Sequence, residues 1–255
     1  MQKVIREKSI LINNQVAKTS YLLRANDIII GDIELKEKST KIIPQKIKLD
    51  IIFEDEDMLV INKQPNIVVH PGNGNPSGTI ANGIAHYLKL DSLDGSNIRV
   101  GIVHRLDKET SGLMIVAKNI KSHEIISRQF ADRLVKKKYH AIVWGKVLND
   151  SGIINANIDR DKKNRVRFNV SELSGRQSVT KYKVIKRYKN FTFIELSPKT
   201  GRTHQIRVHM KFLGHPIICD SLYGGGKGKS AGSNKNSQQI INKIFKSINR
   251  VALHA

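Results

Sequence analysis

The sequence predicts a fold of the α+β class, built on a mixed but largely antiparallel sheet. Three observations point to it: the predicted strands outnumber the helices, they follow one another in runs, and a regular βαβ alternation is missing. With 255 residues the chain can form one sizeable domain and a small appendage. We place the boundary near Leu49, so residues 1–48 form the appendage and residues 49–255 the main domain.

The appendage contains hairpin material. Residues 10–14 and 28–31 are expected to be brief strands, and Asn13 and Asn14 are expected to form a turn. This is too little apolar sequence for an independent core.

The main domain opens with two strands and a helix. Apolar runs on both sides of residues 54–57 predict two strands joined by an acidic turn. After a loop rich in Gly, Pro and Asn, the apolar residues Ile80, Ile84 and Leu88 recur at a spacing of four. This spacing predicts a helix, which Thr79 can cap.

Strands dominate the remainder of the main domain. The expected strands cover residues 100–103, 113–117, 139–144, 166–170, 179–185 and 192–196, and the expected helices cover residues 122–131 and 203–213. Gly214 and Pro216 end the last helix. Residues 91–97 are expected to be a loop. Residues 223–242 have a composition typical of a flexible basic loop, after which the core resumes at residues 251–253.

The charge balance indicates a polyanionic partner. The chain has 44 Lys and Arg against 22 Asp and Glu, a net charge of +22, and such a surface repels itself unless an anion covers it. Residues 160–189 hold eleven basic and two acidic residues, and no acidic residue follows Asp220. This localised excess favours nucleic-acid binding. A lysine-rich solvated surface from an AT-biased genome is the alternative.

The sequence also bounds the compartment. No stretch approaches the roughly 20 apolar residues that span a membrane, and the start lacks the apolar core of a signal peptide. The single cysteine, Cys219, excludes an intrachain disulfide and fits a reducing compartment. We therefore expect a cytoplasmic protein without a membrane partner.

One carboxylate stands out as a candidate for chemistry. In HRLDKETSGL, residues 104–113, Asp107 lies in a loop between a predicted strand and a turn closed by Gly112. A loop at a strand end makes a carboxylate accessible. From spacing alone, a turn cap with Thr110 or Ser111 is the favoured interpretation of Asp107, because turn aspartates are far commoner than catalytic ones.

Several segments together resemble one enzyme family. HRLDKETSGL resembles, over ten positions in order, the signature of the pseudouridine synthases of the RluA/RluD type. KKYHAIVWG (137–145) and TGRTHQIRVH (200–209) are similar to two further segments of that family, and VVHPGNGNPSGT (68–79) is similar to its branch acting on large-subunit ribosomal RNA, the D-like synthases. GHPIICDSLYGG, from Gly214, continues the resemblance except at Cys219, where the family usually has glycine.

The resemblance implies an activity and a set of catalytic residues. It implies an RNA pseudouridine synthase that acts without a cofactor, as a monomer, on large-subunit ribosomal RNA or its assembling particle. Asp107 would be the catalytic carboxylate, Tyr139 would pack against the target base, and Arg202 would pair with Asp107. A guanidinium suits that role, because a carboxylate that must stay ionised away from water needs a nearby cation.

The resemblance and the basic segment together give a set of expected RNA contacts. The residues expected to bind RNA are His104, Arg105, Lys138, Arg165 and Arg167. A stacked uridine is unreachable, so it must flip out at a cost of a few kcal/mol. In the family, the residue equivalent to Arg105 can enter the RNA stack where the base left, and its planar group suits stacking. A structural ion pair is the alternative for Arg105, and core packing is the alternative for Tyr139.

Two other functions stay open at this point. A catalytically impaired rRNA-binding remnant would keep the basic surface, and a nuclease could use His104 or His204 as acid and base. The presence of Asp107, Tyr139 and Arg202 together favours the synthase, because a binding remnant has no need of all three. A metal site is not expected, since the sequence has no His-Glu-x-x-His.

The first 48 residues resemble part of a second module. They look like the second half of the S4-like RNA-binding module that commonly precedes this catalytic domain. Asn14 and Asn26 stand where that module usually has glycine, and its first helix is missing. We therefore expect a partial S4-like module with reduced affinity for RNA.

Overall fold

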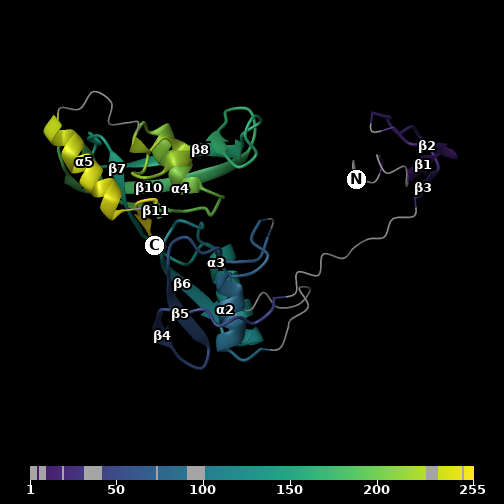
Figure 1. Ribbon diagram of the computed structural model, residues 1–255, viewed down its shortest axis with the longest axis horizontal. Coiled ribbons are helices and arrows are strands. Elements are labelled where there is room, and N and C mark those ends of the chain that lie inside the picture. The colour runs from purple at the N-terminus through teal and green to yellow at the C-terminus, as the bar shows by residue number, and fades with distance from the viewer. Residues whose placement is uncertain are drawn as a thin grey trace. The chain divides into compact units, whose positions relative to one another are not determined.

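The structure is a computed structural model that divides into two compact units. It describes residues 5, 10–18, 20–31, 42–72, 74–90, 101–227, 235–248 and 250–255. The units are Met1–Ser39 and Thr40–Ala255 (Figure 1). This division precedes the predicted boundary near Leu49, because residues 42–49 pack in the larger unit. Ile42 and Leu49 belong to one of its hydrophobic clusters, and the backbone N–H of Gln45 donates to the carbonyl of Asn82.

The smaller unit contains a three-stranded antiparallel sheet in the order β2-β1-β3. Its strands are β1 (Ile10–Ile12), β2 (Gln15–Val16) and β3 (Ile29–Gly31). Asn13 and Asn14 form the predicted turn with φ angles of 51° and 66°. Asn26, with a φ of 70°, also adopts the left-handed region, which asparagine tolerates better than most residues. Asparagine at positions 14 and 26 is thus compatible with these turns, although glycine was expected there from the resemblance to the S4-like module.

The larger unit is built on a six-stranded antiparallel sheet, which confirms the predicted α+β class. Its strand order is β12-β7-β11-β10-β8-β9. The strands are β7 (Tyr139–Trp144), β8 (Ser151–Arg160), β9 (Phe168–Val170), β10 (Arg176–Arg187), β11 (Phe191–Pro198) and β12 (Leu253–His254). Along most of β11, buried and less buried residues alternate, as expected for a strand with one face on the core.

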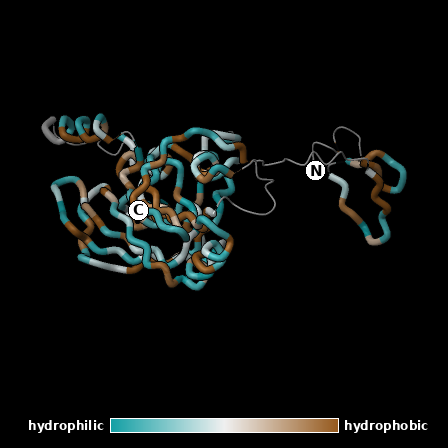
Figure 2. Tube along the Cα trace, turned by 90° about the horizontal axis from the view of Figure 1, so that it is seen from below, coloured by the Kyte–Doolittle hydropathy of each residue, from teal (hydrophilic) through white to brown (hydrophobic). Residues whose placement is uncertain are grey.

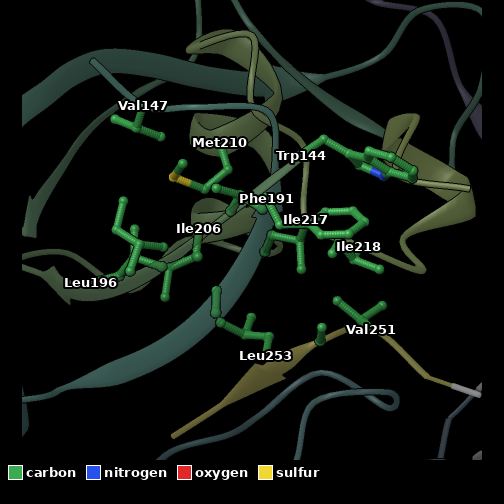
Figure 3. Close-up of a cluster of buried hydrophobic side chains, with 14 of the residues drawn as sticks. Trp144, Val147, Phe191, Leu196, Ile206, Met210, Ile217, Ile218, Val251 and Leu253 are labelled. Carbon is green, nitrogen blue, oxygen red and sulfur yellow. The ribbon is translucent and has the colours of Figure 1, made fainter. Parts of the chain in front are cut away.

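Two helices pack against the hydrophobic core of this sheet. They are α4 (Gln205–Phe212) and α5 (Lys235–Ser247), and the short 3-10 helix η1 (Ser221–Tyr223) lies between them in sequence. Ile206 and Met210 of α4 converge with Phe191 and Leu253 in one buried cluster (Figure 3). The fully buried Ile241 anchors α5 to the same cluster. This core fixes α4, which carries the residues described below.

A three-stranded antiparallel sheet, in the order β4-β5-β6, carries a second core in the larger unit. Its elements are β4 (Ile51–Glu54), β5 (Met58–Lys63), β6 (Gly112–Ala117), α2 (Ile80–Tyr87) and α3 (Ile120–Ala131). Helix α2 begins as predicted at Thr79, whose side chain accepts a hydrogen bond from the N–H of Asn82, while the side chain of Asn82 accepts one from the N–H of Thr79. Buried Ile84 of α2 packs in the same cluster as Leu59 of β5.

The loop that carries Asp107 lies where the two sheets of the larger unit meet. Before it, Ile102 forms an isolated β-bridge with Val116 of β6; after it, Ser111 bridges to His254 of β12. The loop is therefore held at one end by the three-stranded sheet and at the other by the edge of the six-stranded sheet. This anchoring places a polar loop against two packed cores.

Three regions differ from the prediction. The strand predicted over residues 100–103 is wrong within the described residues 101–103, because Gly101 turns the chain with a φ of 66° and Ile102 forms only an isolated bridge with Val116. Strand β8 was not predicted, and the prediction of a flexible loop over residues 223–242 is wrong where η1 and α5 form. Apolar residues recur among polar ones along α5, as expected for a helix with one buried face (Figure 2). Residues 228–234 of that predicted loop, and the predicted loop over residues 91–97, lie outside the described residues. Within the described part of the chain, no helix is long and apolar enough to cross a membrane.

Candidate active site

A cavity of about 530 Å³ opens beside the Asp107 loop. Asp107, Tyr139, Arg202, His104 and Arg105 all line it, so the structure brings together five of the residues singled out in the sequence. The volume lies within the range of about 300–1,000 Å³ that is usual for small-molecule sites. The cavity is thus large enough to receive a ligand of nucleoside size.

The carboxylate of Asp107 contacts a buried arginine. Oδ2 of Asp107 lies 3.6 Å from Nη1 of Arg207, and the two side chains are 21% and 5% exposed. Nε and Nη2 of Arg207 donate to the two oxygens of the fully buried Asp220, at 2.8 and 2.9 Å. Asp220 therefore fixes the guanidinium by two parallel hydrogen bonds, and the third nitrogen, Nη1, faces Asp107.

The electrostatics of Arg207 follow from this arrangement. Burial alone lowers the pKa of Arg207, but the hydrogen bonds and charge of Asp220, with the charges of Asp107 and Glu109, raise that pKa above its ordinary value overall. Arg207 thus remains positively charged inside the protein. A fixed positive charge therefore lies behind the cavity wall, 3.6 Å from the Asp107 carboxylate.

The prediction that Arg202 pairs with Asp107 is wrong. Arg202 lies in the turn before α4, where its backbone exchanges hydrogen bonds with Gln205. It lines the cavity, but within the described part of the chain it forms no ion pair, and its buried Nε has no hydrogen-bond partner. Helix α4 begins at Gln205, so Arg207 lies in its first turn, and it is the side chain of Arg207 that contacts Asp107.

Asp107 does not act through its side chain as a turn cap. The backbone N–H of Thr110 donates to the carbonyl oxygen of Asp107 at 3.2 Å, which closes the turn through the main chain. Among the described residues, the contact of the Asp107 carboxylate is the one with Arg207. The carboxylate is thus left available to a ligand in the cavity.

Tyr139 joins the cavity to both cores. It is half-buried, and its ring packs against the clusters of both sheets. Burial, and then the negative charge of Asp107, raise the pKa of Tyr139 to about 12, so its phenol is protonated at neutral pH. Core packing and a place beside a ligand are therefore both compatible with its position.

The two histidines of the nuclease hypothesis are poorly suited to acid catalysis. Nε2 of His104 accepts a hydrogen bond from the N–H of Ile115 at 2.9 Å, and the ring stacks on Phe130. Burial, and then the charge of Lys137, lower the pKa of His104 to about 4. Nδ1 of His204 lies 2.8 Å from the Tyr223 hydroxyl, and burial lowers its pKa as well. Both rings are therefore neutral near pH 7, which argues against that hypothesis.

The other residues predicted to bind RNA lie at different distances from the cavity. Arg105 is exposed and lines the cavity, and among the described residues it forms no ion pair. Lys138 lines a neighbouring cavity and pairs with Glu195 at 3.5 Å. Arg165 and Arg167 lie on the loop between β8 and β9 and line neither cavity. Their role in RNA binding stays a prediction.

A buried lysine, Lys63, is hydrogen-bonded to the Asp107 loop. Lys63, at the end of β5, is 1% exposed, and its Nζ donates to the carbonyls of Gln64, Ile67 and Lys108. Lys108 directly follows Asp107, so this bond ties the loop to the three-stranded sheet. Burial lowers the pKa of Lys63 to about 8, although the charge of Asp107 opposes that shift.

The stability contribution of Lys63 should rise with pH. Since its folded pKa of about 8 lies below the ordinary 10.5, the unfolded chain binds more protons between these values. The free energy of unfolding of the wild-type chain should therefore increase, relative to that of Lys63→Met, between pH 8 and pH 10. Urea titrations of both proteins across this range measure the difference. A constant or shrinking difference would contradict the buried, partly neutral lysine.

Three functional residues were missed in the sequence, namely Arg207, Asp220 and Lys63. Signals for the first two were present. Arg207 stands between Ile206 and Val208 on a predicted helix, and Asp220 is the last acidic residue of the chain, just after an apolar run. A charge among apolar residues usually needs a buried partner of opposite sign. Lys63 ends an apolar strand in the same way.

Comparisons with known proteins agree on one family. A family model described as RNA pseudouridylate synthase matches residues 57–212. The chain is 42% identical, over 267 residues, to a protein of Buchnera aphidicola subsp. Acyrthosiphon pisum named ribosomal large subunit pseudouridine synthase D. That alignment covers 100% of this chain and 83% of the relative. An uncharacterized RNA pseudouridine synthase of Chlorobaculum parvum is 40% identical over 260 residues, covering 100% of this chain and 79% of the relative.

Solved structures show the same fold. The human RNA pseudouridylate synthase domain containing 4 superposes with a TM-score of 0.62 at 26% identity, and the match covers 81% of this chain and 82% of the human chain. The residues matched by the family model include Asp107, Tyr139 and Arg207. These three residues therefore lie inside the matched region, whereas Asp220, the partner of Arg207, follows it.

Proposed function

This chain belongs to the RNA pseudouridylate synthase family, and from that premise we propose that it isomerises specific uridines of large-subunit ribosomal RNA. One observation carries the proposal. The carboxylate of Asp107 faces a cavity of about 530 Å³ and is backed by the buried, charged Arg207. The name of the Buchnera relative, which refers to the ribosomal large subunit, supports the choice of RNA.

The chemistry is an intramolecular rearrangement. The bond between uracil N1 and ribose C1′ breaks, the uracil turns while it stays bound, and a bond between C5 and C1′ forms. C5 loses a proton and N1 ends protonated, so the overall composition is unchanged and the reaction needs no oxidant or reductant. Asp107 would act on the ribose or the base to start this sequence, and Tyr139 would pack against the uracil as it turns.

The cavity requires the target base to leave the RNA stack. Flipping costs a few kcal/mol, which contacts in the cavity and in the gap must offset. Arg105 is exposed at the cavity and free of ion pairs among the described residues, so its planar group is available to enter the stack. The net charge of +22 supports attraction of the RNA. The protein would act as a monomer on large-subunit ribosomal RNA, free or in its assembling particle. The single cysteine fits action in the cytoplasm.

Mapping of pseudouridine tests this proposal directly. Large-subunit and small-subunit rRNA transcripts, both unmodified, would be incubated with the chain, labelled with carbodiimide and analysed by primer extension. We expect pseudouridine at discrete sites of the large-subunit RNA and none in the small-subunit RNA. Conversion of the small-subunit RNA alone would overturn the substrate class. Tight, salt-sensitive binding of RNA without any conversion would favour a catalytically impaired remnant instead.

We further propose that the smaller unit is a partial S4-like module that adds RNA affinity without entering the chemistry. A chain of residues 40–255 should then bind rRNA more weakly than the full chain, by about tenfold if the unit contributes about 1.4 kcal/mol. Its single-turnover rate at saturating RNA and its melting temperature should match those of the full chain. Filter binding and quenched-flow conversion measure both quantities. Equal affinity would exclude an RNA-binding role, and a lost rate would assign the unit to catalysis.

A further inference from the structure

A second, smaller cavity adjoins the catalytic cavity. Its volume is about 170 Å³, and five basic side chains line it, those of Arg133, Lys136, Lys137, Lys138 and Lys199. We call these five residues the flanking subsite. Arg133, Lys137 and Lys199 also line the catalytic cavity, so the two cavities share a wall.

The charges of the flanking subsite are poorly compensated by the protein. None of the described residues that line the smaller cavity is acidic. Within the described part of the chain, Lys138 alone of the five forms an ion pair, a 3.5 Å contact with Glu195 in which the lysine side chain is 71% exposed. An exposed pair of this kind contributes little. Clustered cations repel one another unless an external anion neutralises them.

Lys137 is one of the positive charges of the flanking subsite that lack a nearby anion among the described residues. It is half-buried between the two cavities, and its Nζ donates to the carbonyl of Thr200 at 3.4 Å, which is a long hydrogen bond. Burial lowers the pKa of Lys137, and the positive charge of Arg133 lowers it further. An anion in the smaller cavity would offset both effects, because an opposite charge at short range favours the protonated amine.

We propose that the flanking subsite binds the backbone phosphate of a nucleotide next to the target uridine and holds the strand while the base occupies the catalytic cavity. The inference rests on the proposed function, which supplies the RNA. The shared wall supports it, since the phosphates beside a flipped nucleotide stay with the backbone outside the base pocket. Phosphate contacts fix register without reading the base, so the flanking subsite would position the RNA whatever the neighbouring base is.

A double-mutant cycle between protein and RNA tests the contact. A hairpin of large-subunit rRNA that the chain binds would carry a neutral methylphosphonate at one loop phosphate at a time. The protein variant is Arg133→Gln with Lys199→Gln, and dissociation constants come from filter binding. We expect one methylphosphonate, next to the converted uridine, to weaken wild-type binding about tenfold. The variant should bind the unmodified hairpin about tenfold more weakly and lose nothing more at that phosphate.

The matched control removes the same charge elsewhere. Lys186→Gln with Lys189→Gln neutralises two lysines at the β10–β11 hairpin. Lys186 lies opposite Phe193 in the strand register, near the start of β11, whereas Lys199 follows the end of β11. At about 3.3 Å per residue these positions are far apart along the strand. The control should keep the full sensitivity to the methylphosphonate. The slope of log affinity against log salt should fall by about 1 in the test variant, in line with roughly 0.7 per contact to a single strand.

The outcomes separate the two proposals. If the test variant remains as sensitive as wild type to every methylphosphonate, the flanking subsite does not hold a phosphate and the inference fails. If the coupled phosphate is not adjacent to a converted uridine, the stated position is wrong. Binding is read without turnover, so a chain that converts no uridine contradicts the proposed function separately. A second variant, Lys136→Gln, changes an exposed residue and repeats the cycle should the double variant melt at a lower temperature.

Discussion

Replacing Asp107 by asparagine should abolish pseudouridine formation and leave the protein folded. The amide has nearly the same shape, but it is neither a nucleophile nor a base, so we expect the single-turnover rate to fall by at least about 10⁴-fold. The fold should persist because Arg207 keeps both hydrogen bonds to Asp220. Quenched-flow conversion of a bound rRNA hairpin measures the rate, and circular dichroism melting with filter binding measures fold and affinity.

A neighbouring carboxylate supplies the control for Asp107. Glu109 also contacts Arg207, at 3.5 Å, but its side chain is 44% exposed and does not line the catalytic cavity. Glu109→Gln should therefore retain a rate within about tenfold of wild type, since an exposed pair contributes at most about 1 kcal/mol. A rate for Asp107→Asn close to that of Glu109→Gln would show that Asp107 is not the reacting carboxylate.

Replacing Arg207 by methionine should lower both stability and activity. The change leaves the fully buried Asp220 without its cation, and removing one partner of a buried pair typically costs about 3–5 kcal/mol. It also removes the positive charge 3.6 Å from Asp107, so conversion should be lost even where the variant is folded. Urea unfolding gives the free energy, and conversion assays below the melting transition give the rate.

Arg202 provides the matched comparison, because it is the arginine that the motif first suggests. Arg202→Met removes a half-buried side chain that forms no ion pair among the described residues. It should therefore lower the free energy of unfolding by less than about 1 kcal/mol. If Arg202→Met were the more destabilising of the two, or if Arg207→Met kept the wild-type stability, the assignment of the buried pair would be wrong.

Elements with a clear local signal could be predicted from the sequence. The helix over residues 80–88 has both an apolar period and a capping threonine, and α2 begins where those signals place it. The strand at residues 139–144 alternates in type and forms β7 with the predicted bounds. Local patterns of this kind suffice because the same residues both shape the backbone and face the core.

Elements whose signal depends on distant partners were missed. Strand β8 carries Gly and Asn among its isoleucines, and it is stabilised by pairing with β9 and β10 rather than by propensity. Helix α5 follows a Gly- and Lys-rich stretch whose composition predicts a loop, so its apolar residues at positions 241, 244 and 245 were not read as a helix. In both cases tertiary packing, which a composition does not reveal, decides the structure.

The residues that line the candidate site could be predicted from the sequence, but the buried residues that hold Asp107 in place could not. Asp107, Tyr139 and Arg105 meet in one cavity as the motifs suggested. The arginine that supports Asp107 could not be chosen from the segment TGRTHQIRVH alone, since it depends on where α4 begins. Only the three-dimensional position of Asp220 shows that Arg207 is the buried cation.

Release of tritium from RNA labelled at uracil C5 is the most direct test of the central claim, that the cavity at Asp107 isomerises uridine. Formation of the bond between C5 and C1′ expels the hydrogen of C5 into water. We predict saturating release by the wild-type chain, equal in amount to the pseudouridine mapped in large-subunit rRNA, and no release by Asp107→Asn. Binding of the labelled RNA by the wild-type chain without any tritium release would contradict the account.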